Sequence, residues 1–263
     1  MFDPQDVANI IIKIADNEIL PRFRNLNEDE IKTKSHPGDL VTIADTEAEK
    51  ALTTALSKLL PGSLVVGEEA VAADPNIMDI LNEPNPVWIL DPVDGTANFA
   101  HGHDLFGVIV ALVQNKETIA GWIYDPLRQK MISAQKGCGA FNGNSRLSCT
   151  SPALLPQMRG YFGCSKTPAL ENSVSQNIVH GSAAHDYIAL AEKRMDFAFY
   201  RRVKPWDHAA GVLIYQETGG IAQMIDKSPY HPGPNQEGLL LAPSFSLWNE
   251  LQSLILSNYP QYT

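Results

Sequence analysis

The chain has 263 residues, of which 44% are hydrophobic, so it can bury a sizeable core as one large domain or two packed halves. Its formal net charge of −10 argues against a nucleic-acid partner bound through simple electrostatics. No stretch approaches about 18 consecutive apolar residues, and acidic Asp3 and Asp6 precede the first apolar stretch, so neither a membrane span nor a signal peptide is expected.

In chain order, the first part is predicted to combine helices with an antiparallel or mixed sheet. Asp3 and Pro4 are typical of a helix start, and apolar residues then recur at helical spacing to about Pro21. A second helix is predicted from Thr42 to Leu60. Strands are predicted at 64–66, 87–90, 105–113, 118–124 and 130–134, with a hairpin turn at 114–116 and a surface loop at 73–86.

From about Ser148 the pattern changes to strands that alternate with helices. Strands are predicted at 158–162, 196–200, 221–225 and 238–241, and helices at 182–193, from Asp207 to Glu217 and from Ser244 onward. The chain therefore divides into an α+β half, residues 1–147, and an α/β half, residues 148–263.

The most informative segment is DPVDGTANFAHG, which runs from Asp91 to Gly102. It follows an apolar strand, and its proline turns the chain so that Asp94 returns beside Asp91. Two carboxylates held so close repel each other unless a cation lies between them. Gly95 and Thr96 then open a short helix whose backbone N–H groups can bind an anion. The segment predicts a site for divalent metal and phosphate; alternatively, Asp91 ends a strand and Asp94 caps a helix.

Three other acidic segments lie at the ends of predicted elements. Glu68 and Glu69 follow a predicted strand, and Asp207 starts an apolar helix. Asp45 lies in the first turn of the helix predicted from Thr42, in a pattern that resembles a capping box. Asp207 could also be an N-cap residue with no other role. Oxygen ligands of this kind suit Mg²⁺ or Mn²⁺ better than zinc, which prefers His and Cys.

Histidines and cysteines are not expected to bind this metal. Surface positions, or positions behind the ligands, are predicted for His101, His103 and His208. Buried or free thiols in a reducing cytoplasm are predicted for Cys138, Cys149 and Cys164.

Together, and in this order, the acidic segments resemble the inositol monophosphatase family of metal-dependent phosphatases. The resemblance covers nearly the whole chain through KSHPGDLVTIAD (34–45), GEEA (67–70), the dodecapeptide, GWIYDP (121–126), KGCGAFN (136–142), GSAA (181–184) and KPWDHAAG (204–211). It implies an α+β fold, a layered αβαβα sandwich of the inositol monophosphatase/fructose-bisphosphatase type, with metals between the two halves. It also implies a homodimer.

The resemblance further implies roles for individual residues. One Mg²⁺ would be held by Glu68, Asp91 and the carbonyl of Val93. A second would be held by Asp91, Asp94 and Asp207. Glu68 would support a third ion through water. Asp45 and Thr96, with Glu68, would position and deprotonate the attacking water. Substrate contacts would come from Asp94, Gly95, Thr96, Ser182, Ala183, Tyr200 and Asp207.

The chemistry explains why so many acids are needed. A phosphomonoester dianion would be repelled by these carboxylates, so the site can work only when it is loaded with metal. Bound Mg²⁺ ions lower the pKa of a water molecule and stabilise the departing alkoxide. Positioning and charge neutralisation then carry most of the rate, and no protein nucleophile is required.

Inositol 1-phosphate is the leading substrate, although two positions depart from the family pattern. Inositol monophosphatases usually carry a Glu where this chain has Tyr200, and often an Arg where it has Ile178. The neighbouring Arg201 or Arg202 could bind a second phosphate, as in fructose 1,6-bisphosphate or 3′-phosphoadenosine 5′-phosphate, or could be exposed surface charges.

Several alternatives therefore stay open. A 3′(2′),5′-bisphosphate nucleotidase, a fructose-1,6-bisphosphatase and a histidinol-phosphatase are the alternative enzymes. A regulatory protein that keeps the fold and binds a partner is the alternative from another class. Lys34 and Asp39 could lie at the mouth of the metal site or in a solvated loop.

Overall fold

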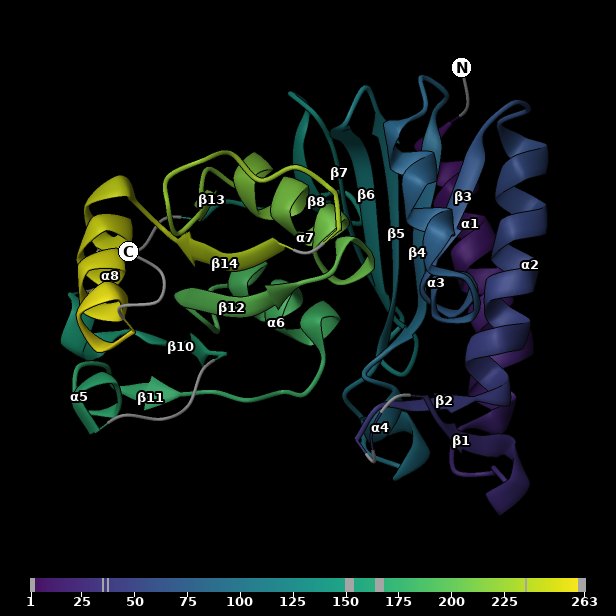
Figure 1. Cartoon of the computed structure of the whole chain (residues 1–263), viewed down its shortest axis with the longest axis horizontal. Coiled ribbons are helices and arrows are strands. Elements are labelled where there is room, and N and C mark those ends of the chain that lie inside the picture. Colours follow the sequence, from purple (N-terminus) through teal and green to yellow (C-terminus); the bar gives the residue numbers. More distant parts are fainter. Residues whose placement is uncertain are drawn as a thin grey trace.

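Five layers of helix and sheet make up the molecule, in the order helix, sheet, helix, sheet, helix (Figure 1). The computed structural model describes residues 3–34, 36, 38–149, 154–163, 168–234 and 236–259. Cys164, which was predicted to be a buried or free thiol, lies outside the described residues. The αβαβα sandwich implied by the sequence is confirmed.

A seven-stranded sheet in the order β3-β4-β5-β6-β7-β8-β9 is the larger of the two main sheets. Its first pair of strands is parallel and the others are antiparallel, which confirms the predicted mixed meander. Asn115 and Lys116 both have positive φ, as a tight two-residue hairpin turn requires. The strands are β3 (Leu64–Gly67), β4 (Val87–Asp94), β5 (Gly107–Gln114), β6 (Glu117–Asp125), β7 (Lys130–Gln135), β8 (Gly139–Asn142) and β9 (Ser145–Arg146).

Strand β4 is apolar along its whole first half because helices cover both faces of this sheet. Trp88 and Leu90 pack towards α1 (Pro4–Ile14) and α2 (Ile43–Leu59), and Ile89 packs towards the opposite face. Alternate side chains of a strand point to opposite faces, so a strand between two helical layers needs no polar face. Two short turns extend the first helix, a π-helix at Ala15–Ile19 and a 3₁₀ helix at Leu20–Arg22.

Helices α6 (Ala183–Ala191) and α7 (Pro205–Glu217) form the middle layer. Their apolar residues, such as Ile188 and Ile214, belong to one core with Ile109 of the seven-stranded sheet and Leu239 of the second sheet. This core therefore joins the two halves of the chain, and it places the start of each helix beside the end of β4.

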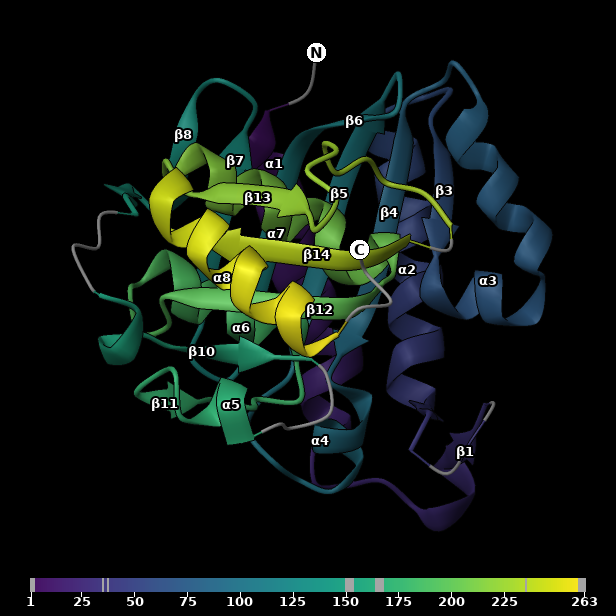
Figure 2. The same cartoon turned by 60° about the vertical axis from the view of Figure 1, so that its left-hand side comes forward.

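A five-stranded sheet in the order β11-β10-β12-β14-β13 follows, and α8 (Phe245–Asn258) covers its outer face (Figure 2). Trp248 and Leu251 of α8 pack on Phe197 and Leu240 of the sheet. The strands are β10 (Arg159–Phe162), β11 (Gln176–Asn177), β12 (Phe197–Val203), β13 (Ile221–Met224) and β14 (Gln236–Ala242).

The remaining elements are short. A two-stranded hairpin connects helix α1 and its extension with α2. The segment 73–86 was predicted to be a surface loop, and this prediction was wrong for its central part: residues Pro75–Asn82 form a 3₁₀ helix, because Leu81 is buried in the core. No described helix combines the length and the apolar character of a membrane span. The short elements are η3 (Glu28–Glu30), β1 (Ile31–Thr33), β2 (Leu40–Thr42), α3 (Glu68–Ala73), η4 (Pro75–Asn82), α4 (Thr96–Ala100), η5 (Leu155–Gln157) and α5 (Pro168–Glu171).

Candidate metal centre

Three aspartates, of which two are buried and Asp207 is half-buried, converge where β4 ends. Carboxylate oxygens of Asp91, Asp94 and Asp207 lie within 4.8 Å of one another. The pairing of β4 with β5 is irregular between Asp91 and Asp94, where Pro92 cannot donate a hydrogen bond to the neighbouring strand. This irregularity lets two residues that are three positions apart turn their carboxylates to one point.

Asp207 reaches this point from the first turn of α7. The N-cap residue of that helix is Lys204, so the alternative interpretation of Asp207 as an N-cap is wrong. Pro205 stands in the first turn, where its missing N–H costs no intrahelical hydrogen bond, and this sets the helix start two residues earlier than predicted. The carboxylate of Asp207 is therefore not used to cap its own helix.

Asp94 is fixed by the start of α6. The hydroxyl of Ser182 and the backbone N–H of Ala184 donate to Asp94 Oδ2, and the N–H of Ala183 donates to Oδ1. Ser182 is also the N-cap of α6, as predicted, because its hydroxyl accepts from the N–H of His185. The N-cap of α4 is Gly95, so Asp94 is not a helix cap.

Asp45 and Thr96 form a hydrogen-bonded pair next to the aspartates. Thr96 Oγ1 lies 2.9 Å from Asp45 Oδ1 and 3.0 Å from the carbonyl of Val93, to either of which it can donate. Asp45 Oδ2 accepts from the N–H of Thr42, which confirms the predicted capping box at the start of α2. One carboxylate therefore both caps a helix and holds the threonine hydroxyl.

Glu68 begins α3, where Lys34 holds it. Lys34 Nζ lies 2.8 Å from Glu68 and 2.6 Å from Glu69. Behind them, Glu49 accepts from the N–H groups of Glu69 and Ala70. Glu68 is not in the cluster of three, but its charge raises the pKa of Asp91 and Asp207, which places it close to both.

Without a bound cation, the buried carboxylates of the cluster repel one another. Burial first, and then the charge of Glu68 and of the other aspartates, raises the pKa of Asp91 well above its usual range. Burial likewise raises the pKa of Asp45 and Asp94, each to about 6, against the hydrogen bonds that they accept. Buried like charges favour protonation unless a cation neutralises them. A hard divalent cation with oxygen ligands therefore fits this donor set.

A pocket of about 840 Å³ opens beside Glu68 and Asp207. Lys34 and Asp39 line it, which places both residues at the mouth of the acid cluster, one of the two positions left open by the sequence. The other polar residues of its wall are His36, Arg202 and Lys204, and the apolar residues are Val71, Ala72, Ala73, Pro75 and Trp206. A pocket of this size can hold a metabolite-sized ligand.

Tyr200 lies in a buried network that its sequence position did not reveal. Its hydroxyl donates to Asp186 Oδ2 over 3.0 Å, and His180 Nδ1 lies 2.7 Å from Asp186 Oδ1. Tyr200 is only 6% exposed. The network thus joins β12 to the turn that precedes Ser182, and the sequence showed only that Asp186 follows the GSAA segment.

Asn98 is a second contributor that the sequence analysis missed. Its side-chain amide donates to the carbonyls of Leu105 and His180 over 2.7 and 2.9 Å, and it lies 3.3 Å from the carbonyl of Gly181. It lies within the dodecapeptide, which was its only signal. The amide holds the α4 turn against the turn that supports Asp94.

The histidines near the acids lie outside the cluster. His101 Nδ1 contacts the carbonyl of Ala97 at the surface, and His103 is exposed. His208 is buried, with Nδ1 3.0 Å from the hydroxyl of Tyr187, and burial lowers its pKa to about 3. It is therefore a neutral ring packed behind Asp207.

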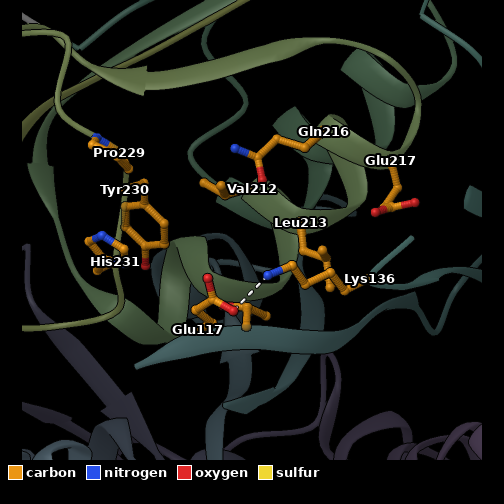
Figure 3. A pocket seen from close by; sticks show the side chains of 10 residues that line it. Glu117, Lys136, Val212, Leu213, Gln216, Glu217, Pro229, Tyr230 and His231 are labelled. Atoms are coloured by element: carbon orange, nitrogen blue, oxygen red, sulfur yellow. Dashed lines mark hydrogen bonds and ion pairs between the residues drawn. The ribbon is translucent and has the colours of Figure 1, made fainter. Parts of the chain in front are cut away.

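Another pocket, of about 240 Å³, lies towards the C-terminal end of α7, away from Asp207 (Figure 3). Its carboxylates already have partners: Glu117 pairs with Lys136 over 2.6 Å, and Glu217 accepts from the N–H groups of Gly137 and Gly139. The candidate centre is therefore the acid cluster at the end of β4.

Comparison with known proteins agrees with this geometry. The sequence profile described as the inositol monophosphatase family matches residues 3–262. "Inositol monophosphatase 1" of Bos taurus is 33% identical over 222 residues, which are 78% of each chain. "Fructose-1,6-bisphosphatase/inositol-1-monophosphatase" of Thermotoga maritima is 30% identical over 199 residues, which are 73% of this chain and 74% of the relative. The solved structure of a Thermotoga maritima IMPase superimposes with a TM-score of 0.82 at 23% identity and 97% coverage of both chains.

Proposed function

Because this chain belongs to the inositol monophosphatase family, whose members are phosphoric monoester hydrolases, we propose that it is a Mg²⁺-dependent phosphatase of a small phosphorylated metabolite. Mn²⁺ is the alternative ion, and two or three ions are proposed per site. The proposed ligands are Glu68, Asp91, the carbonyl of Val93, Asp94 and Asp207.

The observation that carries this proposal is the convergence of three aspartates, two buried and one half-buried, from two elements. Burial and mutual repulsion raise the pKa of Asp91 and Asp207, so a proton or a metal cation must compensate their charge. Such a concentration of carboxylates would repel a phosphate dianion without metal. Bound Mg²⁺ supplies the positive charge that binds phosphate, and it lowers the pKa of a bound water.

The protein's own residues are proposed to orient and deprotonate the attacking water. Asp45 Oδ1 accepts the hydrogen bond of Thr96, so the threonine oxygen can accept a hydrogen bond from water and pass its own proton to Asp45 as it takes the proton of the water. Asp45 has a pKa raised by burial to about 6, which suits a base near neutral pH. Glu68, whose charge acts on both Asp91 and Asp207, is proposed to help position the same water.

Phosphate contacts are proposed on the adjoining turns. Asp94 and Asp207 face the cluster, and the N–H groups of Gly95 and Thr96 begin α4 next to Asp94. Ser182 and Ala183 already bind Asp94 and so border the same place. Inositol 1-phosphate is the first substrate to test, since relatives carry that activity in their names.

The test is phosphate release from a panel of monoesters, with Mg²⁺, with Mn²⁺ and with EDTA. The panel contains inositol 1-phosphate, fructose 1,6-bisphosphate, 3′-phosphoadenosine 5′-phosphate and histidinol phosphate. Turnover that needs the metal supports the proposal, and the preferred compound identifies the substrate. Silence on all four compounds with either ion would contradict it and would favour a regulatory protein that keeps the fold.

The protein is further proposed to be a cytoplasmic homodimer. Cys138 is an exposed free thiol, which suits a reducing compartment such as the cytoplasm. A homodimer is proposed from the family resemblance alone. Light scattering coupled to gel filtration would measure the assembly, and a monomer across micromolar concentrations would contradict it.

A further inference from the structure

The 840 Å³ mouth pocket is lined by charges of both signs. Glu68, Asp207 and Asp39 line it, and the ammonium of Lys34 already pairs with Glu68. The two other cations of the lining, Arg202 and Lys204, come from the end of β12 and the start of α7. Both cations are exposed, and neither forms an ion pair with a carboxylate in the described part of the chain. Lys204 Nζ lies 5.7 Å from the ring centroid of Trp206, which holds the ammonium over the pocket wall.

Arg202 also lines a second hollow. This hollow measures about 240 Å³, and Tyr161, Gly163, Tyr200 and Arg201 are its other lining residues. A Cβ at Gly163 would come within 2.7 Å of the carbonyl of Phe199, so the glycine allows two strands to approach closely beneath the hollow. Arg202 therefore borders both the mouth pocket and a hollow lined by the aromatic residues Tyr161 and Tyr200.

The second hollow has no carboxylate among its lining residues. The hydroxyl of Tyr200, which is one of them, already donates to buried Asp186. Two cations thus border the leaving-group side, where a carboxylate acceptor would suit a neutral sugar alcohol. Arg binds phosphate and carboxylate through a rigid fork of N–H donors, which makes it an anion receptor.

We infer that the preferred substrate is a phosphomonoester whose alcohol part carries a second anionic group, a phosphate or a carboxylate, which Arg202 and Lys204 bind. The inference rests on the proposed function, since it concerns the leaving group of that same reaction. The hydrolysed phosphate lies at the acid cluster, and the second anion lies across the mouth at Arg202. The pocket has room for both groups in one molecule of metabolite size.

The experiment compares two pairs of substrates that differ in one anion. Fructose 1-phosphate is compared with fructose 1,6-bisphosphate, and glycerol 2-phosphate with 2-phosphoglycerate, each with Mg²⁺. The doubly anionic member of at least one pair is expected to have the higher kcat/KM, by about tenfold or more, because a charge-assisted contact supplies that much affinity. The sugar pair reports on a second phosphate and the glycerol pair on a carboxylate.

Variants then assign the effect to residues. Arg202→Gln and Lys204→Gln are each expected to lower the ratio of kcat/KM within the responsive pair towards one, mainly through KM, because the second anion is bound equally before and during reaction. Arg194→Gln is the matched control, because this exposed arginine follows the far end of α6, and its ratio should equal that of the wild type.

The results distinguish failure of the inference about the second anion from failure of the phosphatase proposal. Active wild-type enzyme with ratios near one in both pairs would overturn the inference and leave the phosphatase proposal standing, as would ratios that neither Arg202→Gln nor Lys204→Gln lowers. Mg²⁺-dependent phosphate release from inositol 1-phosphate but from none of these four compounds would overturn the inference and leave the phosphatase proposal standing. Absence of release from inositol 1-phosphate, 3′-phosphoadenosine 5′-phosphate and histidinol phosphate as well would overturn the proposed function, and the inference with it.

Discussion

At the scale of single residues, Asp94 shows how the site is both charged and held in place. Three donors from the start of α6 fix its carboxylate, while the same carboxylate lies beside Asp91 and Asp207. These hydrogen bonds lower the cost of keeping the charge buried, although burial still raises its pKa. A side chain fixed in this way has little freedom left to lose when it binds a cation.

Replacing Asp94 by Asn should therefore remove function and keep the fold. We expect kcat with Mg²⁺ to fall about a hundredfold or more, because one charge of the metal site is lost. Melting of the metal-free variant should occur at or above the wild-type temperature, since a buried repulsion disappears. Asp104→Asn is the control, because Asp104 is exposed and pairs with Arg24. Wild-type activity in the Asp94 variant would contradict the assignment.

Tyr200→Phe tests whether Tyr200 acts on the site through Asp186. Loss of the hydroxyl leaves Asp186 with one fewer donor in a buried place, at a cost of about 1–3 kcal/mol of stability. The turn before Ser182 should loosen, so the Mg²⁺ concentration for half-maximal rate should rise at unchanged substrate KM. A change in KM alone would instead indicate direct contact with the substrate, the role implied by the family resemblance. Activity against Mg²⁺ concentration separates the two.

At the scale of elements, the site depends on a tight joint between α4 and the turn before α6. Gly95 has φ +85°, and a Cβ there would lie 2.8 Å from the carbonyl of Leu105 and 3.1 Å from the Cβ of Ser182. Asn98 crosses the same joint with its amide. The joint sets the place of Asp94 relative to its donors.

Gly95→Ala should break this joint, whereas Gly137→Ala should not. Both glycines have positive φ, but a Cβ at Gly137 would meet nothing within 4 Å. We expect the strained backbone to cost each variant about 1–2 kcal/mol, and Gly95→Ala to lose further stability and most of its activity. Thermal melting and kcat measure both effects. Equal losses in the two variants would show that the contacts at Gly95 are unimportant.

Long elements with clear ends were predictable from the sequence, and so were the three aspartates that the structure brings together. Thr42 marked the start of α2 and Pro61 its end, and apolar runs marked β4 and β5. These features could be predicted because capping residues and runs of buried residues are local signals in the sequence. Strands of two or three residues, such as β9 and β11, have too few residues for periodicity and were missed. The hydrogen bond between Tyr200 and Asp186 could not be predicted either, because a contact between two elements does not show in the spacing of residues along the sequence.

At the scale of the whole molecule, metal and pH should control stability together. Asp45 and Asp94 have a folded-state pKa of about 6, above their ordinary value, so the metal-free folded protein holds protons that the unfolded chain has released. This contribution is present at about pH 4 and is lost as pH rises through 6, and it amounts to about 3 kcal/mol for each group. His208, whose pKa is lowered to about 3, acts in the opposite direction over the same range.

The comparison with Asp94→Asn isolates the acid effect. In EDTA, the variant should melt above the wild type at pH 7.5, and the gap should narrow at pH 5, where Asp94 of the wild type is protonated. Addition of Mg²⁺ at pH 7.5 should raise the wild-type melting temperature more than that of the variant. A gap that stays constant between the two pH values would contradict the raised pKa.

The distribution of the clustered acids over the two halves of the chain has a practical consequence. Asp91 and Asp94 belong to the first part of the chain, whereas Asp207 and the donors that fix Asp94 belong to the second. Two separate polypeptides, 1–147 and 148–263, would each carry an incomplete set, and their shared core would drive them together. Turnover would then report reassembly, so this chain could serve as a split enzyme whose signal depends on the proximity of two fused proteins.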